Sequence, residues 1–317
     1  MKHVHLGRTG IRVSELCLGT MTFGNEADEP MSVAIMDRAF EAGINFFDTA
    51  NIYNKGRTEE IVGRWMAPHR EDLILASKVH FPSGDGVNDR GSSRRHILRE
   101  VEKSLKRLNT DWLDLLYLHH WDDYTPLEES LAAMTTLVNH GKVHYCAVSN
   151  FSGWQTMKAI AVAASNGFAP ITCIQPMYNL VKRQAEVEIL PMARSEGLGV
   201  CPYSPLAAGL LTGKYQRGET GRIQESEMYS ERYKSPSYTD AAERFVAHAN
   251  KRGFDPAALA VAWVVSHPAV TSAIIGARSL AQFNQTLTGA DIQLSPGERA
   301  EISLLSPEPP LPTDREK

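Results

Sequence analysis

Four polar side chains of complementary chemistry follow apolar stretches of strand length. Asp48 and Tyr53 come after the apolar run 44–47, Lys78 ends the stretch LILASK, and His119 follows DLLYL. A free tyrosine has a pKa near ~10, so it exchanges protons poorly at neutral pH. An adjacent ammonium favours the phenolate, a carboxylate can hold that ammonium in place, and a neutral imidazole can orient a carbonyl oxygen. The set suits proton transfer to an alkoxide that develops during hydride addition.

Further polar residues and a glycine follow the later apolar stretches. They are Ser149, Asn150, Gln175, Tyr203, Ser204, Gly276, Arg278 and Ser279. Each position alone has a simpler interpretation, such as a helix cap for Asp48, a solvated charge for Lys78 or a core histidine for His119. Parallel strands closed into a barrel would bring all these positions to one rim, where barrel enzymes build their sites. The recurrence therefore favours a common site.

Eight strand-length stretches alternate with helical patterns along the 317 residues. Strands are expected at 16–18, 44–47, 73–77, 114–118, 143–148, 171–174, 198–202 and 272–275. Helices are expected at 30–42, 57–67, 93–108, 126–140, 152–165, 183–196, 240–252, 256–266 and 279–288. This alternation, with no linker that would separate two domains, predicts an α/β fold: one (β/α)8 TIM barrel over residues 1–317. A doubly wound sheet is the structural alternative, but no GxGxxG turn follows the first strand.

Three segments lie outside the repeating units. Residues 4–13 predict an N-terminal β-hairpin that turns at 7–10 and could plug the N-terminal face of the barrel. Residues 209–239 form a long polar segment between the seventh strand and its helix, and loops of this length usually carry function. C-terminal helices complete the fold, and the Pro-rich, charged tail after residue 306 is expected to fray.

Composition excludes several classes of protein. The net charge of -4 indicates neither a nucleic-acid partner nor an anionic membrane surface. No apolar run reaches the roughly 18 residues of a membrane span, and the first residues contain no signal-peptide pattern, so a cytoplasmic protein is expected. The four cysteines form no CxxC motif and lie in apolar stretches, which indicates reduced core residues.

Other hydrolytic and metal-dependent chemistries fit the sequence less well. No GxSxG serine motif is present, and Asp48 has no obvious second acid of a glycosidase pair. The HVH at residues 3–5 imitates a barrel metal motif. Those histidines precede the hairpin rather than a core strand, and the later strands do not each supply a ligand. We therefore expect no metal.

Eight segments, taken in order, resemble the successive signatures of the aldo-keto reductases. They are LGRTGIRVSELCLGTMTFG, INFFDTANIY, ILASKV, WLDLLYLHHWD, AVSNFS, IQPMYN, YSPLAAGLLTGKY and AIIGARSLAQ. The resemblance runs from about residue 4 to 290 and is to the branch with bacterial oxidoreductases and potassium-channel beta subunits. It implies reduction of aldehydes and ketones to alcohols with NADPH. The alternative that it implies is an NADP(H)-binding regulatory or redox-sensing subunit with little turnover.

The resemblance also implies a role for each matching residue. Tyr53 would be the general acid, Lys78 would lower its pKa, Asp48 would position Lys78, and His119 rather than His120 would orient the carbonyl. Ser149, Asn150 and Gln175 would bond the nicotinamide amide, Tyr203 would stack on its ring, and Gly19, Thr20, Met21 and Asp48 would border the nicotinamide and its ribose. The diphosphate and adenosine would contact Ser204, Leu206, Gly209, Leu211, Lys214, Gly276, Arg278, Ser279 and Gln282.

Two features qualify the cofactor assignment. Arg278 falls where the family meets the adenosine 2'-phosphate, which a guanidinium can grip through two hydrogen bonds. The simpler interpretation is a solvated arginine at the rim. The family usually ends this motif with Glu-Asn, where this chain has Gln285 and Thr286. The adenosine contacts of this segment are therefore expected to differ.

The substrate pocket is expected above the nicotinamide, between the loops 22–29, 80–91, 120–125 and 215–239. Aromatic residues in these loops predict an apolar slot; they are Phe23, Phe81, Trp121, Tyr124, Tyr229 and Tyr233. Arg90, Arg94 and Arg95 suit the exposed start of a helix better than an anionic substrate. The sequence therefore predicts a neutral, fairly apolar small-molecule carbonyl substrate and, by default, a monomer.

Overall fold

Eight parallel strands form the central sheet of the computed structural model, which describes residues 1–311 and 313. Their order in the sheet is β10-β3-β4-β5-β6-β7-β8-β9. The strands are β3 (Leu16–Gly19), β4 (Phe46–Asp48), β5 (Ile74–Val79), β6 (Leu113–Leu118), β7 (Val143–Ser149), β8 (Ile171–Gln175), β9 (Gly199–Val200) and β10 (Ala273–Ile275). Every predicted strand is present.

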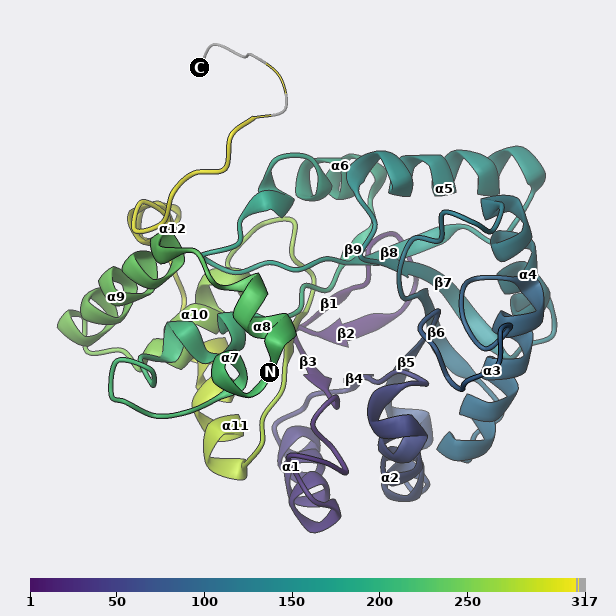
Figure 1. Ribbon diagram of the computed structural model, residues 1–317, viewed down its shortest axis with the longest axis horizontal. Coiled ribbons are helices and arrows are strands. Elements are labelled where there is room, and N and C mark those ends of the chain that lie inside the picture. The colour runs from purple at the N-terminus through teal and green to yellow at the C-terminus, as the bar shows by residue number, and fades with distance from the viewer. Residues whose placement is uncertain (312, 314–317) are drawn as a thin grey trace.

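Backbone hydrogen bonds join the two outer strands of this sheet to each other. The Ser272 amide donates to the Val200 carbonyl over 3.2 Å, and the Ile274 amide donates to the Pro202 carbonyl over 2.9 Å. The curled sheet is thus closed, with helices around it (Figure 1). The predicted (β/α)8 architecture is confirmed.

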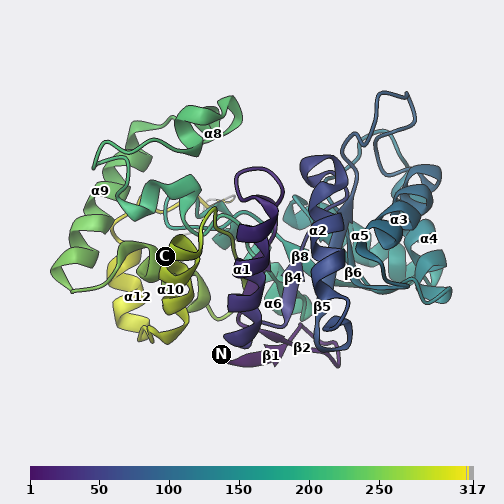
Figure 2. The same cartoon turned by 90° about the horizontal axis from the view of Figure 1, so that it is seen from below.

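Helices follow the strands along the chain, and most of them cover the outside of the barrel (Figures 1 and 2). They are α1 (Glu29–Glu41), α2 (Arg57–Met66), α3 (Arg94–Leu108), α4 (Leu127–Asn139), α5 (Gly153–Asn166), α6 (Ile189–Glu196), α7 (Arg222–Glu225), α8 (Glu227–Arg232), α9 (Pro236–Lys251), α10 (Pro256–Val265), α11 (Leu280–Leu287) and α12 (Pro296–Ser303). Local sequence sets several of their starts. Ser152 and Gln155 form a capping box on α5, and Asp255 caps α10 ahead of Pro256.

The predicted N-terminal hairpin is confirmed and lies at the bottom of the barrel in Figure 2, as β1 (His3–His5) paired with β2 (Arg12–Ser14). Leu6 and Val13 are fully buried among side chains of the barrel interior. At Gly7, where φ is +56°, a Cβ would come within 2.4 Å of the Gly199 amide nitrogen. The hairpin therefore closes the face opposite the carboxyl ends of the strands, and its histidines lie away from that rim.

Three boundaries differ from the prediction. The seventh barrel strand is shorter than 198–202, because Pro202 has no N–H for the sheet and the regular pairing ends at Val200. The expected helix 183–196 is a 3-10 turn, Gln184–Glu186, followed by α6. The polar segment 209–239 is not one open loop, because it contains α7, α8 and the start of α9.

The expected frayed tail falls partly outside the described residues. Of the tail, the structure describes 307–311 and 313, which form no helix or strand, while 312 and 314–317 lie outside the description. None of the helices in the described chain is long and apolar enough to cross a membrane.

Candidate functional site

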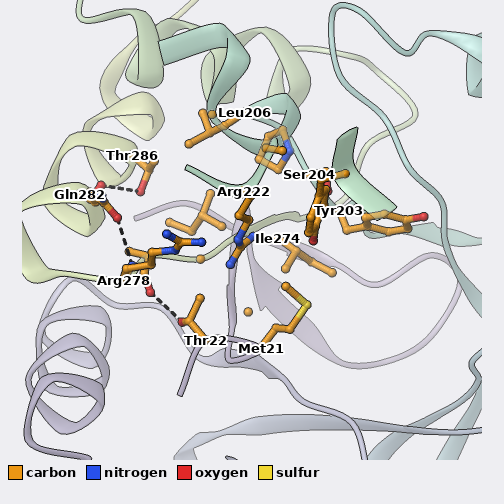
Figure 3. A pocket seen from close by; sticks show the side chains of 18 of the residues that line it. Met21, Thr22, Tyr203, Ser204, Leu206, Arg222, Ile274, Arg278, Gln282 and Thr286 are labelled. Carbon is orange, nitrogen blue, oxygen red and sulfur yellow. Dashed lines mark hydrogen bonds between the residues drawn. The ribbon is translucent and has the colours of Figure 1, made fainter. Parts of the chain in front are cut away.

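The carboxyl ends of the barrel strands open into a cavity of about 1170 Å³ (Figure 3). Most of the predicted site residues line it: Gly19, Thr20, Met21, Asp48, Tyr53, His119, Ser149, Asn150, Gln175, Tyr203, Ser204, Leu206, Gly209, Lys214, Gly276, Arg278 and Gln282. Three do not. Lys78 is buried beneath the cavity wall, Leu211 is fully buried in the core, and Ser279 caps α11.

Lys78 connects a carboxylate to a phenol at the base of the cavity. Its ammonium donates to Asp48 Oδ1 over 2.5 Å, to the Thr49 carbonyl over 2.8 Å and to the Tyr53 hydroxyl over 3.2 Å. Neighbouring strands set this geometry, because Lys78 lies on β5 and Asp48 ends β4. A 3-10 turn at Tyr53–Gly56 then carries the phenol back over the rim. We call these three residues, together with His119, the tyrosine end of the cavity.

Burial and charge oppose each other at the tyrosine end. Burial alone would lower the pKa of Lys78, but Asp48 and Tyr53 outweigh it, so the pKa of Lys78 lies above its usual value. Burial, with Asp48, raises the pKa of Tyr53 even though Lys78 lowers it. Lys78 lowers the pKa of Tyr53, as the sequence predicted. The pKa of Tyr53 nevertheless lies above its usual value, whereas the sequence predicted a value below it. Tyr53 is therefore a protonated phenol at neutral pH.

His119 is neutral and unpaired. Burial, followed by the positive charge of Lys78, lowers its pKa well below the usual value. Its Nδ1 is buried without a hydrogen-bond partner in the described structure. The Phe81 ring packs edge-on against the imidazole with ring centres 4.8 Å apart, and the Tyr53 ring centre lies 6.2 Å away. The imidazole can therefore exchange a hydrogen bond with a ligand in the cavity.

An amide network spans the ends of β7 and β8. Gln175 Nε2 donates to Asp48 Oδ2 over 2.8 Å, so both carboxylate oxygens of Asp48 are bonded. Asn150 Nδ2 donates to the His119 carbonyl over 2.9 Å, and the Tyr203 hydroxyl donates to Asn150 Oδ1 over 2.7 Å. Asn150 has φ +58°, a left-handed conformation that such bonds help to hold. The network fixes the Asp48 carboxylate and the wall of the cavity.

Cations gather at the other side of the cavity. Arg278 donates to Glu225 over 2.8 Å and lies 3.5 Å from Glu26, while Arg222 lies 3.8 Å from the same Glu26. Burial and the neighbouring Arg278 lower the pKa of Lys214. Figure 3 shows Arg222 and Arg278 reaching into the same part of the cavity. We call Lys214, Arg222 and Arg278 the arginine end. Such a group favours an anionic ligand.

Gln285 and Thr286, which stand where the family usually has Glu-Asn, lie at this arginine end. Both residues line the cavity. The Thr286 hydroxyl donates back to the Phe283 carbonyl of its own helix over 2.9 Å. That bond uses the Thr286 hydroxyl within α11. Gln285 and Thr286 therefore offer a ligand fewer hydrogen-bonding groups than the carboxylate and amide that the family usually has in this motif.

Sequence reasoning located only part of the cavity wall. Of the six expected aromatic residues, Phe81 and Tyr229 line it. Phe23 and Tyr233 are buried in the core, Trp121 packs on Phe151 and Trp154, and Tyr124 is 96% exposed.

The residues that sequence reasoning missed are chiefly Thr22, His120, Met228, Arg217, Arg222 and Arg232. The repeated arginines of the polar segment 209–239 were the available signal, since a barrel loop of this length usually folds over a site.

The structure also describes the acidic, histidine and cysteine side chains that could bind a metal or form disulfides. Among the described residues no cluster of three or more His, Cys, Asp or Glu side chains is placed to hold a metal. All four cysteines are free thiols and buried, as expected for core residues.

The fold and the cavity together describe a barrel protein with a buried carboxylate–ammonium–phenol chain and a group of cations at one rim. The chain matches the aldo/keto reductase family over residues 15–306. It is 44% identical over 306 residues to "Uncharacterized oxidoreductase YrpG" of Bacillus subtilis (strain 168). The alignment covers 93% of this chain and 92% of that protein. This chain therefore belongs to the aldo/keto reductase family.

Other relatives carry different names. "Probable voltage-gated potassium channel subunit beta" of Oryza sativa subsp. japonica is 38% identical, covering 97% of this chain and 94% of that protein. "Norsolorinic acid reductase A" of Aspergillus parasiticus is 32% identical, covering 94% of this chain and 79% of that protein. The family and the oxidoreductase relatives support an oxidoreductase that acts on carbonyl compounds.

Proposed function

We propose that this protein reduces aldehydes and ketones to alcohols with NADPH, and that Tyr53 is the general acid. The observation that carries the proposal is the buried chain from Asp48 through Lys78 to the Tyr53 hydroxyl at the base of the cavity. Bound NADPH would supply the hydride. The remaining requirement is a proton for the alkoxide, and the protein provides it.

The proton would come from the Tyr53 phenol. Because burial keeps Tyr53 protonated, it can donate at neutral pH, and the Lys78 ammonium 3.2 Å away would stabilise the phenolate that remains. Asp48 positions Lys78 and balances its charge in the buried site. His119, neutral and unpaired, would donate a hydrogen bond to the carbonyl oxygen and so orient it.

The arginine end of the cavity supports the choice of NADPH as the cofactor. Lys214, Arg222 and Arg278 converge there, and their paired carboxylates, Glu26 and Glu225, are exposed enough to turn away. Arg278 would take the 2'-phosphate, Lys214 the diphosphate, and Ser204, Leu206, Gly209, Gly276 and Gln282 would border the adenosine half. Leu211 and Ser279 would act through the loop and the cap of α11 rather than by lining the site. NADH lacks the phosphate that this group suits.

The nicotinamide would bind at the amide network, which must then exchange bonds. Gln175 already gives its amide nitrogen to Asp48, so its Oε1 would accept from the carboxamide. Asn150 is bonded through both amide atoms and would have to release one partner. Ser149 and Tyr203 complete this wall, with Gly19, Thr20 and Met21 opposite.

The test is NADPH oxidation at 340 nm with a panel of reactive aldehydes, for the parent and for Tyr53→Phe. Loss of the proton donor should lower kcat by about 10²- to 10⁴-fold while NADPH still binds. Tyr215→Phe is a matched control, because that hydroxyl also bonds within the site region, to the Ala208 carbonyl. Equal activity of Tyr53→Phe and the parent would remove Tyr53 from this role.

A second candidate is a cofactor-binding regulatory subunit, because relatives at 36–38% identity carry the channel subunit name. The complete group of Tyr53, Lys78, Asp48 and His119 favours the enzyme. Tight NADPH binding without turnover on any carbonyl would favour the regulatory subunit. For the enzyme we propose a single cytoplasmic domain that works as a monomer, without a nucleic-acid or membrane partner.

A further inference from the structure

The charges that line the cavity are unequally paired. The lining carboxylates are Asp48, Glu219 and Asp255, and the lining cations are Lys214, Arg217, Arg222, Arg232 and Arg278. Arg217 pairs with Glu219 over 2.8 Å, and the arginines of the arginine end pair with Glu26 and Glu225. The side chain of Arg232 has no carboxylate partner and no hydrogen bond within the described part of the chain. It is the exception among these arginines.

Arg232 is held in place without being neutralised. It ends α8 in the polar segment 209–239 and is half-buried at the cavity wall. Its guanidinium carbon lies 5.4 Å from the centre of the Tyr229 ring. Stacking on an aromatic ring orients a guanidinium but leaves its N–H groups free to bond a planar anion. The Arg232 side chain is therefore held in one orientation, and its N–H groups have no hydrogen-bond acceptor from the described part of the protein.

Arg232 lies where the arginine end meets the strand ends beside Tyr203. The guanidinium carbon of Arg222, which belongs to the arginine end, is 5.7 Å from the centre of the same Tyr229 ring. The next residue in the chain, Tyr233, accepts a hydrogen bond from Asn179 over 3.2 Å, and Asn179 also donates to the Ser204 carbonyl over 2.9 Å. The positive charge of Arg232 opposes the effect of burial on Tyr203, whose pKa is raised to about 12. Arg232 therefore borders both groups, and it differs from Arg222 and Arg278 in having no carboxylate partner.

The protein has no spare carboxylate for Arg232 in the cavity wall. Asp48 is bonded by Lys78 and Gln175, and Asp255 accepts the Ala257 and Ala258 amides at the start of α10. The missing partner must come from a ligand. A half-buried guanidinium gains most from a carboxylate, which accepts two parallel hydrogen bonds.

We propose that Arg232 binds a carboxylate of the substrate, so that the preferred carbonyl compounds carry this anion across an aromatic or apolar spacer. The inference rests on the proposed function, because the carbonyl must lie at Tyr53 while the carboxylate reaches Arg232. Tyr229, Met228 and Phe81 line the cavity and suit the spacer. The substrate then differs from the neutral compound expected from the sequence.

The test compares 4-carboxybenzaldehyde with its methyl ester, which has the same ring and aldehyde but no charge. The parent should show the higher kcat/KM for the acid, and Arg232→Gln should lower the acid-to-ester ratio by about 10- to 100-fold. Arg232→Lys should restore part of the ratio. Lys234→Gln is the matched control, because Lys234 is an exposed cation two residues along, paired with Glu231, and the ratio should not change.

Each outcome decides the proposal. A parent ratio near one, or an unchanged ratio in Arg232→Gln, overturns it. Weaker NADPH binding in Arg232→Gln at an unchanged ratio would assign Arg232 to the cofactor instead. If the parent reduces neither aldehyde, the proposed function fails. The role of Arg232 is then tested by measuring the affinity of the NADP⁺-loaded protein for 4-carboxybenzyl alcohol. Equal affinity of parent and Arg232→Gln then overturns the inference, and a loss in the variant supports it.

Discussion

The tyrosine end and the arginine end of the cavity hold their charges in opposite ways. At the tyrosine end, Lys78 and Asp48 are almost completely buried, and both oxygens of Asp48 are bonded, one by Lys78 of the neighbouring strand β5 and the other by Gln175 of β8. At the arginine end, Arg278 is 27% exposed and its partner Glu225 is 46% exposed, on the short helix α7. Burial makes the first group part of the fold, whereas solvent screening leaves the second free to exchange partners.

This difference separates two demands on one cavity. Proton transfer needs groups that are already oriented when the substrate arrives, and rigid strands provide that. A cofactor that enters and leaves needs contacts that can be broken, and exposed ion pairs on a long segment provide that. The comparison predicts that changes at the tyrosine end affect stability and chemistry together, while changes at the arginine end affect binding alone.

The largest effect is expected for Lys78→Met. The substitution leaves the Asp48 carboxylate buried without its cation, which should cost about 3–5 kcal/mol of unfolding free energy and abolish measurable reduction. Urea denaturation followed by circular dichroism measures the stability. Arg217→Gln removes an exposed cation from the Arg217–Glu219 pair and should cost under about 1 kcal/mol. A loss for Lys78→Met as small as that of Arg217→Gln would contradict the structural role of the buried pair.

A smaller effect is expected for Arg278→Ala at the other end. Loss of the guanidinium should lower the preference for NADPH over NADH by about 10- to 100-fold, because only NADPH offers the 2'-phosphate. Fluorescence titration with both cofactors measures the ratio, and the urea midpoint should stay close to that of the parent. Arg252→Ala, which removes another ion-paired surface arginine, serves as the control. An unchanged ratio would make Arg278 a solvated rim residue.

Sequence reasoning succeeded where strand periodicity fixed the geometry. Asp48, Lys78 and Tyr53 could be placed together because consecutive parallel strands must end at one rim. It succeeded less where tertiary packing decided. Nothing local distinguishes Phe23, which is fully buried in the core, from Tyr229, which lines the cavity, because both belong to segments that the sequence predicts as loops. The net pKa of Tyr53 also depends on how completely the loops bury it, which strand spacing does not determine.

The pH dependence of stability should further distinguish the tyrosine end from the arginine end. The pKa of Tyr53 and that of Lys78 are raised, so their contribution to stability is complete below pH ~10 and is lost as pH rises through the folded-state values. The pKa of His119 is lowered, so its contribution is complete above pH ~6.5 and is lost as pH falls.

Activity should follow the same limits. We expect kcat/KM for a neutral aldehyde to be level from about pH 6.5 to 9 and to fall only at higher pH, as Tyr53 loses its proton. Stopped-flow reduction across this range measures it. A titration near pH 7 that disappears in His119→Gln would show that His119 is charged in the working protein.

The smallest effect is expected for Glu225→Gln. In the free protein Glu225 accepts a hydrogen bond from Arg278 over 2.8 Å, and Arg278 holds the pKa of this carboxyl below its usual range. A cofactor phosphate must displace this carboxylate, so its removal should tighten NADPH binding by about two- to fivefold, with a smaller gain at high salt. Isothermal titration at two salt concentrations measures the change, and Glu219→Gln, which frees Arg217 rather than Arg278, is the matched control. Weaker NADPH binding in Glu225→Gln would mean that the Glu225–Arg278 pair persists in the complex and keeps α7 closed over the bound cofactor. The arginine end would then be a fixed structure, as the tyrosine end is.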